Sequence, residues 1–158
     1  MYGEGIYVGY KHCDLRAVEP AFPFGHGLSY TSFDFNSLAT TSVSDEGDLT
    51  VSFEVKNTGK VDGAEVAQVY IAAPVEGRIT SPLKELKAFE KVVLKAGEAK
   101  TVDVKLSREA FSYWDEQRAK FVAPRGTYEV RVATSSSEKD VKLRAPVELV
   151  KEIRWNGL

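Results

Sequence analysis

From Ser32 onward the sequence consists of short runs in which hydrophobic and polar residues alternate, separated by turn residues. The clearest run is 49–56, where Leu49, Val51, Phe53 and Val55 alternate with polar side chains. Because successive side chains of a β-strand point to opposite faces of its sheet, this run predicts a strand with one buried and one solvated face. A series of such runs is typical of an antiparallel β-sandwich with little helix.

We predict about seven or eight strands from these runs. Seven of the runs are 33–36, 49–56, 63–74, 83–94, 102–106, 128–132 and 141–143. A short hairpin of 113–114 with 121–122 adds to them, and 147–149 extends the edge after the last run. The run 63–74 is apolar on both faces, which predicts a central strand covered on both sides. The run 83–94 would also suit a helical turn, but we favour a strand. Ser107 is predicted to cap one helical turn that ends at Phe111.

The predicted fold class is all-β, an immunoglobulin-like or fibronectin type III-like antiparallel β-sandwich with an extended N-terminal arm. The only cysteine is Cys13, so the Cys, Trp, Cys spacing of antibody domains is missing and the fibronectin type III-like variant fits better. No internal disulfide can form, and the compartment stays open between cytoplasmic and secreted. The 158 residues are enough for one domain that buries a core of its own.

Residues 1–31 differ in composition from the rest of the chain. They are rich in glycine and aromatic residues and poor in aliphatic ones. No strand or helix periodicity runs through them, so we interpret this segment as an extended arm that packs on another surface. That surface is either this chain's own sandwich or a preceding domain, and composition alone does not decide between them.

Charge and hydrophobicity exclude several classes of partner. The chain has 21 Lys and Arg against 23 Asp and Glu, a net charge of -2, which argues against nucleic acid as a partner. No uncharged apolar stretch approaches the roughly 18 residues of a membrane span, and the first residues lack the pattern of a signal peptide. We therefore expect a soluble chain without a membrane partner.

The residue types that commonly bind metals or catalyse reactions are concentrated in the arm. His12, Cys13, Asp14 and His26 are the only such cluster, but their spacing matches no standard metal site. A Cys13–His26 nucleophile pair is conceivable, although nothing around Cys13 predicts a reactive thiol. We expect no metal, no cofactor and no catalytic residue.

Acidic residues are numerous, yet most alternate with apolar residues along predicted strands, as Glu54, Asp103 and Glu129 do. This placement puts their carboxyl groups on the solvated face. A glycosidase acid instead needs an apolar pocket and a second carboxylate at about 5 to 9.5 Å. We therefore interpret these acids as surface residues.

Aromatic residues near the predicted hairpin form the one candidate binding site. Tyr113, Trp114 and Tyr128, with Tyr70 as a further candidate, would suit a platform on which sugar rings stack. The alternative is that these rings fill the space between the two sheets of the sandwich. Periodicity does not separate the two interpretations.

Several segments, taken in order, resemble one enzyme family. These segments are EGIYVGYKHCD, EPAFPFGHGLSYTSF, VKNTGKVDGAEVAQVY, PLKELKAFEKVVLKAGE, FSYWDE and PRGTYEVRVATSSS. They resemble the C-terminal part of the glycoside hydrolase family 3 enzymes, which include many β-glucosidases. The resemblance extends over most of 4–137, and FPFGHGLSY at 22–30 is its most specific element.

The resemblance implies that 1–31 is the end of a preceding α/β domain with its linker, and that 32–158 is the family's fibronectin type III-like domain. The family's aspartate nucleophile and general acid lie upstream, and no Ser-Asp-Trp segment of the nucleophile type occurs here. The implied function is a non-catalytic accessory domain, with the catalytic domains of a β-glucosidase as partners. The alternatives are a module that binds β-linked oligosaccharides through its aromatics, and an interaction module that dimerises through the arm.

Overall fold

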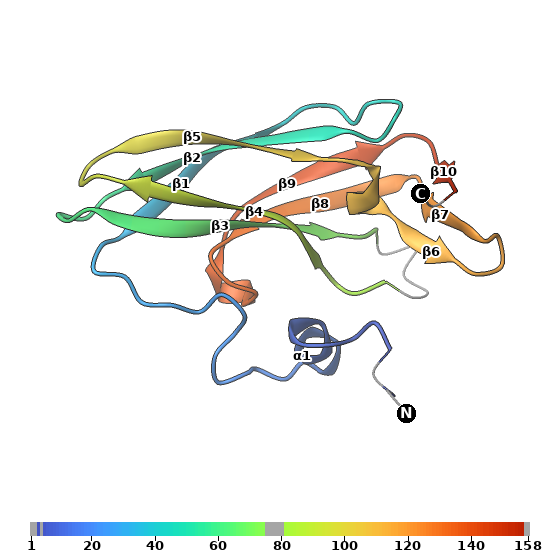
Figure 1. Cartoon of the computed structure of the whole chain (residues 1–158), viewed down its shortest axis with the longest axis horizontal. Helices are drawn as coiled ribbons and strands as arrows, with labels where there is room; N and C mark the ends of the chain where they lie inside the picture. Colours follow the sequence, from blue (N-terminus) through green and yellow to red (C-terminus); the bar gives the residue numbers. More distant parts are fainter. Residues whose placement is uncertain (1–2, 4, 75–80, 157–158) are drawn as a thin grey trace.

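The computed structural model describes residues 3, 5–74 and 81–156 of the chain. These residues form ten antiparallel strands, one short α-helix and two 3-10 helices (Figure 1). The strands are β1 (Phe33–Thr40), β2 (Leu49–Asn57), β3 (Gly63–Ala72), β4 (Glu85–Leu94), β5 (Ala99–Leu106), β6 (Tyr113–Asp115), β7 (Lys120–Ala123), β8 (Gly126–Ala133), β9 (Val141–Leu149) and β10 (Ile153–Trp155). The helices are α1 (Tyr10–Arg16), η2 (Arg108–Phe111) and η3 (Glu138–Asp140).

Two larger sheets make up the sandwich. One has the strand order β1-β2-β5 and the other has the order β4-β3-β8-β9. A third, small sheet of order β10-β7-β6 lies at one end of the sandwich (Figure 1). The all-β, fibronectin type III-like sandwich predicted from the sequence is confirmed.

The core lies between the two larger sheets and is made by the alternating residues that the sequence singles out. Val51, Phe53 and Val55 of β2 are at most 1% exposed. Phe53 stacks on Phe35 of β1 with ring centroids 6.2 Å apart. The same cluster includes Val69 of β3 and residues of β4, β5, β8 and β9. Alternation along each strand therefore places one set of side chains in a shared apolar interior.

Strand β3 is the central strand that the apolar run predicts. It pairs with β4 on one side and with β8 on the other. Every residue of the segment 67–72 is buried. Val69 and its alternate neighbours face the core, whereas Gln68 and Tyr70 point to the outer face of the sheet. Both faces are therefore covered, as expected.

The region 83–94 is a strand over Glu85–Leu94, so the helical alternative is wrong. The helical turn after Ser107 is present as η2, but the Ser107 hydroxyl donates to the Glu109 carboxylate and does not cap a backbone N–H. Residues 75–80, between the predicted runs 63–74 and 83–94, lie outside the described residues.

The structure has more strands than the predicted seven or eight. The short β10 adds to the predicted hairpin and forms the third sheet with β6 and β7. Three-residue strands such as Ile153–Trp155 are too short to show an alternating pattern. By contrast, 141–149 is a single strand where the pattern suggested two segments.

The arm is not extended throughout, because it contains the seven-residue helix α1. The helix ends at Arg16, and the next residue, Ala17, adopts a left-handed conformation with φ 51° and donates its N–H to the carbonyl of Asp14. Among the described residues, no helix is long and apolar enough to cross a membrane.

Candidate functional site

The arm lies across the outer face of the four-stranded sheet (Figure 1). The ring of Tyr10, the first residue of α1, meets the ring of buried Tyr70 edge-on, with centroids 5.8 Å apart. The Tyr10 hydroxyl accepts a hydrogen bond from the backbone N–H of Leu86 at 2.8 Å. Burial raises the pKa of the Tyr10 hydroxyl above its usual 10.0, and the hydrogen bond from Leu86 opposes that change. The first anchor of the arm is therefore an aromatic side chain on the arm-facing side of β3 and β4.

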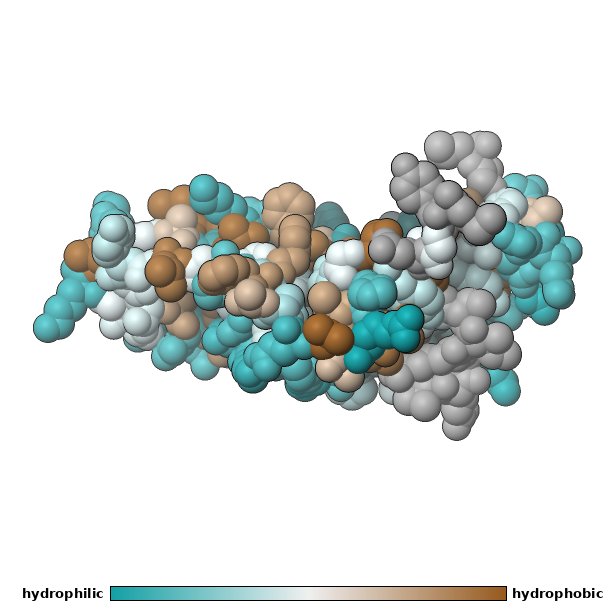
Figure 2. Space-filling view, turned by 90° about the horizontal axis from the view of Figure 1, so that it is seen from below, coloured by the Kyte–Doolittle hydropathy of each residue, from teal (hydrophilic) through white to brown (hydrophobic). Residues whose placement is uncertain are grey.

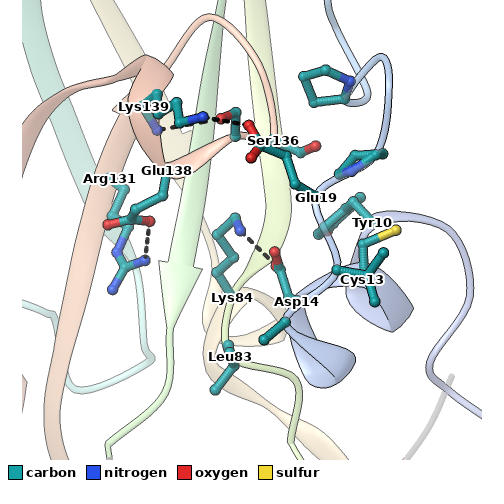
Figure 3. Close-up of a pocket in the computed structure, with 15 residues that line it drawn as sticks. Tyr10, Cys13, Asp14, Glu19, Leu83, Lys84, Arg131, Ser136, Glu138 and Lys139 are labelled. Atoms are coloured by element: carbon teal, nitrogen blue, oxygen red, sulfur yellow. Dashed lines mark hydrogen bonds and ion pairs between the residues drawn. The ribbon is translucent and has the colours of Figure 1, made fainter.

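A second anchor is an ion pair in which the cation is almost completely removed from water, while the carboxylate is 20% exposed. The ammonium of Lys84 donates to Asp14 Oδ2 at 2.5 Å, and the Lys84 side chain is only 5% exposed (Figure 3). The same ammonium lies 5.8 Å from the centre of the Tyr10 ring. Buried cations are rare in proteins unless they are paired. Asp14 therefore neutralises a charge that the sandwich presents to the arm.

The FPFGHG motif supplies a third anchor, made by backbone atoms. The carbonyl of Phe24 accepts a hydrogen bond from the N–H of Ser136 at 2.8 Å. Gly25 has φ +87°, and a Cβ built there would lie 2.1 Å from Nε2 of Gln68. That amide is itself fixed, because it donates to the carbonyl of Thr134 at 2.9 Å and its oxygen accepts from the Tyr70 hydroxyl at 2.5 Å. Glycine is therefore required where the arm crosses β3.

A pocket of about 540 Å³ remains between α1 and the sandwich (Figure 3). The arm lines it with apolar residues such as Val18 but also with Asp14 and Glu19, and the sandwich contributes a mostly polar wall. Arg131 and Glu138 form an ion pair on that polar wall. Burial would raise the pKa of Glu138, but hydrogen bonding to Arg144 and the charge of Arg131 hold it below its usual 4.5. The polar wall is a charge-paired surface suited to hydrogen bonding.

The arm also contacts a carboxylate of the sandwich, Glu85 of β4, and this contact depends on pH. Glu85 accepts hydrogen bonds from Lys11 of α1 and from Lys87. Burial would raise the pKa of Glu85, but these two lysines lower it below its usual 4.5. A carboxyl group whose pKa is lower in the folded state stabilises that state above the unfolded pKa, and the stabilisation is lost as the pH falls through the folded value.

We therefore expect the arm to dock less tightly below about pH 4.5 than at pH 7. Hydrogen-exchange protection factors of the α1 amides, measured across this range, are expected to fall in acid while those of β2 persist. Glu85→Gln is the matched control, because it cannot titrate and should make this step smaller than in the wild type. An equal acid step in the Glu85→Gln variant would contradict the assignment.

The structure does not bring together the arm residues considered for chemistry. Cys13 lines the pocket under α1, whereas His26 packs against Phe22, with ring centroids 5.3 Å apart, and lines a different groove. Within the described part of the chain, no group of three or more His, Cys, Asp or Glu side chains could hold a metal ion.

The residues predicted as a sugar platform lie in different environments. Tyr128 is 2% exposed, and its hydroxyl donates to the carbonyls of Pro124 at 2.7 Å and Phe111 at 3.3 Å. Burial raises the pKa of this hydroxyl well above its usual 10.0. Tyr70 is fully buried, and Tyr113 is half-buried. Tyr128 and Tyr70 therefore pack inside and present no ring face to a ligand.

Trp114 alone among these residues is substantially exposed, at 47%. Its ring meets Phe121 edge-on at 5.0 Å, and Phe121 stacks on Trp155 at 5.4 Å. The Arg108 guanidinium lies 4.7 Å from the centre of the Trp155 ring. Sequence reasoning missed Trp155 and Arg108, because nothing in the sequence indicated that the last strand pairs with the hairpin.

Comparison with known proteins gives one consistent result. The family model described as a fibronectin type III-like domain matches residues 65–136. The chain is 44% identical over 165 aligned residues to probable β-glucosidase I of Aspergillus fumigatus, covering 100% of this chain and 19% of that protein. It is 39% identical to thermostable β-glucosidase B of Acetivibrio thermocellus, covering 99% of this chain and 21% of that protein. The chain thus spans about one fifth of the length of these relatives.

Solved structures give the same picture. A β-glucosidase from Kluyveromyces marxianus superimposes with a TM-score of 0.91 at 42% identity, over 99% of this chain and 18% of that one. β-Glucosidase 3B from Thermotoga neapolitana, solved in complex with glucose, gives 0.89 at 39% identity, over 99% of this chain and 21% of that one. Because nearly all of this chain is covered, the likeness includes the arm as well as the sandwich.

Proposed function

Because this chain belongs to the fibronectin type III-like domains of the glycoside hydrolase family 3 β-glucosidases, we propose that it is a non-catalytic accessory domain that stabilises the catalytic part of such an enzyme. The observation that carries this proposal is the extent of the match. The whole chain aligns with relatives named β-glucosidase, yet it spans only 19% of the first of them. The remaining length of those relatives is available for the residues that hydrolyse a glucoside.

The division of the chain follows from the same proposal. Residues 1–31 would be the linker from the end of a preceding α/β domain, and 32–158 would be the accessory domain. Three anchors at Tyr10, Asp14 and Gly25 support this division, because they fix the linker on the sandwich. A linker held in this way would transmit the position of the sandwich to whatever precedes it.

The hydrolase of which this domain would be part is expected to cleave terminal β-D-glucosyl residues. We infer that reaction from the names of the relatives and from the glucose in the Thermotoga neapolitana structure. Retaining hydrolysis needs two carboxyl groups about 5–5.5 Å apart. The proposal assigns that pair to the catalytic part and none of it to this chain.

A chimera tests the proposal. The matching 18% of the Kluyveromyces marxianus β-glucosidase is replaced by this chain, and the chimera is compared with a truncated enzyme that lacks the region. We expect the chimera to hydrolyse an aryl β-glucoside and to outlast the truncated enzyme on heating, while the isolated chain releases no product. Steady product release by the isolated chain, abolished by substituting one of its own acids, would refute an accessory role.

Binding of sugar at Trp114 is a separate prediction with its own test. Trp114 lies edge-on to Phe121, and Arg108 lies over Trp155, so the cluster offers no pair of open ring faces. We therefore expect cello-oligosaccharides to leave the tryptophan fluorescence of the chain unchanged. A saturable shift that disappears in Trp114→Ala would instead establish a binding platform.

A further inference from the structure

The arm is anchored to the sandwich, yet several of its largest hydrophobic side chains are exposed. Leu28 is 96% exposed, Tyr30 is 102% exposed and Phe24 is 58% exposed. The backbone beside them is fixed, since the Phe24 carbonyl is hydrogen-bonded to Ser136 and Gly25 lies against Gln68. The exposure is therefore a property of a positioned surface and does not come from a loose tail.

Strand β4 extends this exposed surface. Phe89 is 68% exposed and Val93 is 70% exposed. Phe89 pairs with Gln68, and Val93 pairs with Ala64. Partners in a ladder share a face, so both side chains lie on the side of the sheet that the arm crosses. β4 thus contributes two apolar residues to the same side as the arm.

A groove connects the two sets of residues. Phe24 and Leu28 line one wall, and Leu86 and Phe89 line the other, around a volume of about 730 Å³. Figure 2, seen from the arm side, shows hydrophobic residues at the surface in several places along this face. We define the arm–β4 surface by the residues Phe24, Leu28, Tyr30, Phe89 and Val93.

Such a surface is costly in water. Each exposed Leu, Val or Phe side chain forgoes the stabilisation that its transfer from water to an apolar surface would supply. Exposed apolar surface that gathers in one place marks an interaction site more often than scattered single residues do. Of the charged residues that line the groove, Asp140 accepts from the Ser135 hydroxyl, while Glu65 and Lys91 lie on its β3 and β4 walls. The complementary partner is therefore an apolar face with polar groups opposite Lys91 and Glu65.

We propose that the arm–β4 surface docks against an apolar face of the catalytic part of the same polypeptide. This proposal rests on the proposed function and adds the residues through which the contact is made. The relatives are about five times longer than this chain, so a folded partner of sufficient size is present in each of them. The arm supplies three of the five contact residues. The segment proposed as the linker would therefore also form part of the contact with the catalytic part.

The test uses the chimera together with the isolated chain. Leu28→Ser removes a contact on the arm and Phe89→Ser removes one on β4, while Val150→Ser is a matched control at an equally exposed site, 71%, away from the groove. In the isolated chain all three variants are expected to unfold at nearly the wild-type temperature. In the chimera, Leu28→Ser and Phe89→Ser are each expected to shorten the half-life of activity on heating by about tenfold, and Val150→Ser is not.

Hydroxyl-radical footprinting gives a second measurement that needs no variant. Oxidation of Tyr30 and Phe89, followed by mass spectrometry, is expected to be several-fold slower in the chimera than in the isolated chain. Equal oxidation in both, or a chimera whose half-life is as insensitive to Phe89→Ser as to Val150→Ser, overturns the proposed contact and leaves the accessory role standing. A wild-type chimera that is no more durable than the truncated enzyme overturns the accessory role itself.

Self-association is the competing occupant of the same surface. Light scattering on the isolated chain is expected to give the mass of a monomer. A dimer that Phe89→Ser converts to monomer would show that a second copy covers the surface, and would overturn the proposal.

Discussion

Replacing Asp14 by asparagine is expected to release the N-terminal arm from the sandwich. The Lys84 side chain is 5% exposed and donates to Asp14 at 2.5 Å. Removing one partner of a fully buried ion pair typically costs about 3–5 kcal/mol, because the other charge stays buried without its counter-ion. Asp14 is itself 20% exposed, so we expect a cost at or below the lower end of this range. Lys84 regains water as soon as α1 leaves. The cost therefore falls on the docked arm, and the core of the sandwich should stay intact.

Hydrogen exchange and limited proteolysis measure this release. In Asp14→Asn, the α1 amides should lose most of their protection and the segment 17–32 should be cleaved much faster, while β2 stays protected. Glu19→Gln is the matched control, since its partner Lys139 is 75% exposed and a solvated pair of this kind contributes about 0–1 kcal/mol.

A double variant distinguishes charge from shape. Asp14→Leu combined with Lys84→Met replaces the ion pair by apolar side chains of similar size, which is often neutral or stabilising. We expect it to restore protection of α1. Wild-type protection in Asp14→Asn alone would contradict the view that this ion pair holds the arm.

The sandwich could be predicted from the sequence because each main strand shows its hydrophobic pattern within a short stretch of residues. β2 shows strict alternation of buried and partly exposed residues, and β3 shows the continuous apolar run of a strand covered on both faces. Both patterns can be read within ten residues. The fold class and most strand positions followed from such patterns alone.

The docking of the arm could not be predicted in the same way. Its anchors join residues far apart in sequence: Asp14 and Lys84 are separated by 70 positions, and Tyr10 and Leu86 by 76. No periodicity links such pairs. The sequence predicted that the arm packs on another surface. It did not show whether that surface is the chain's own sandwich or a preceding domain.

The aromatic residues illustrate a second limit. Tyr113, Trp114 and Tyr128 are all aromatic residues near the hairpin, so the sequence treats them alike. In the structure, however, Tyr128 is 2% exposed and Trp114 is 47% exposed. Which rings face inward depends on how the short hairpin meets β10, and three-residue strands carry too little pattern to show it. Residue type alone therefore did not show which of these rings face solvent.

Asn57→Ala is expected to destabilise the whole sandwich, because one fully buried amide joins four parts of the chain. Its Nδ2 donates to the carbonyls of Val61 at 2.9 Å and Leu94 at 3.2 Å. Its Oδ1 accepts from the N–H of Gly59 at 3.1 Å and from the hydroxyl of Thr31 at 2.5 Å. Asn57 thereby connects the end of β2, the following turn, the end of β4 and the residue at which the arm enters the sandwich.

Alanine would leave these groups without their partner in a site that water does not reach, since Asn57 is 0% exposed. Each buried polar group left unsatisfied costs about 1–3 kcal/mol. Because some of the groups that Asn57 bonds can bind water instead, we expect the free energy of unfolding to fall by about 2–4 kcal/mol. Urea denaturation should show a lower midpoint with an unchanged slope. Thr58→Ala is the neighbouring control, because its exposed hydroxyl makes one hydrogen bond, to Ser32. Equal midpoints for the two variants would mean that the turn holds its shape without the Asn57 amide.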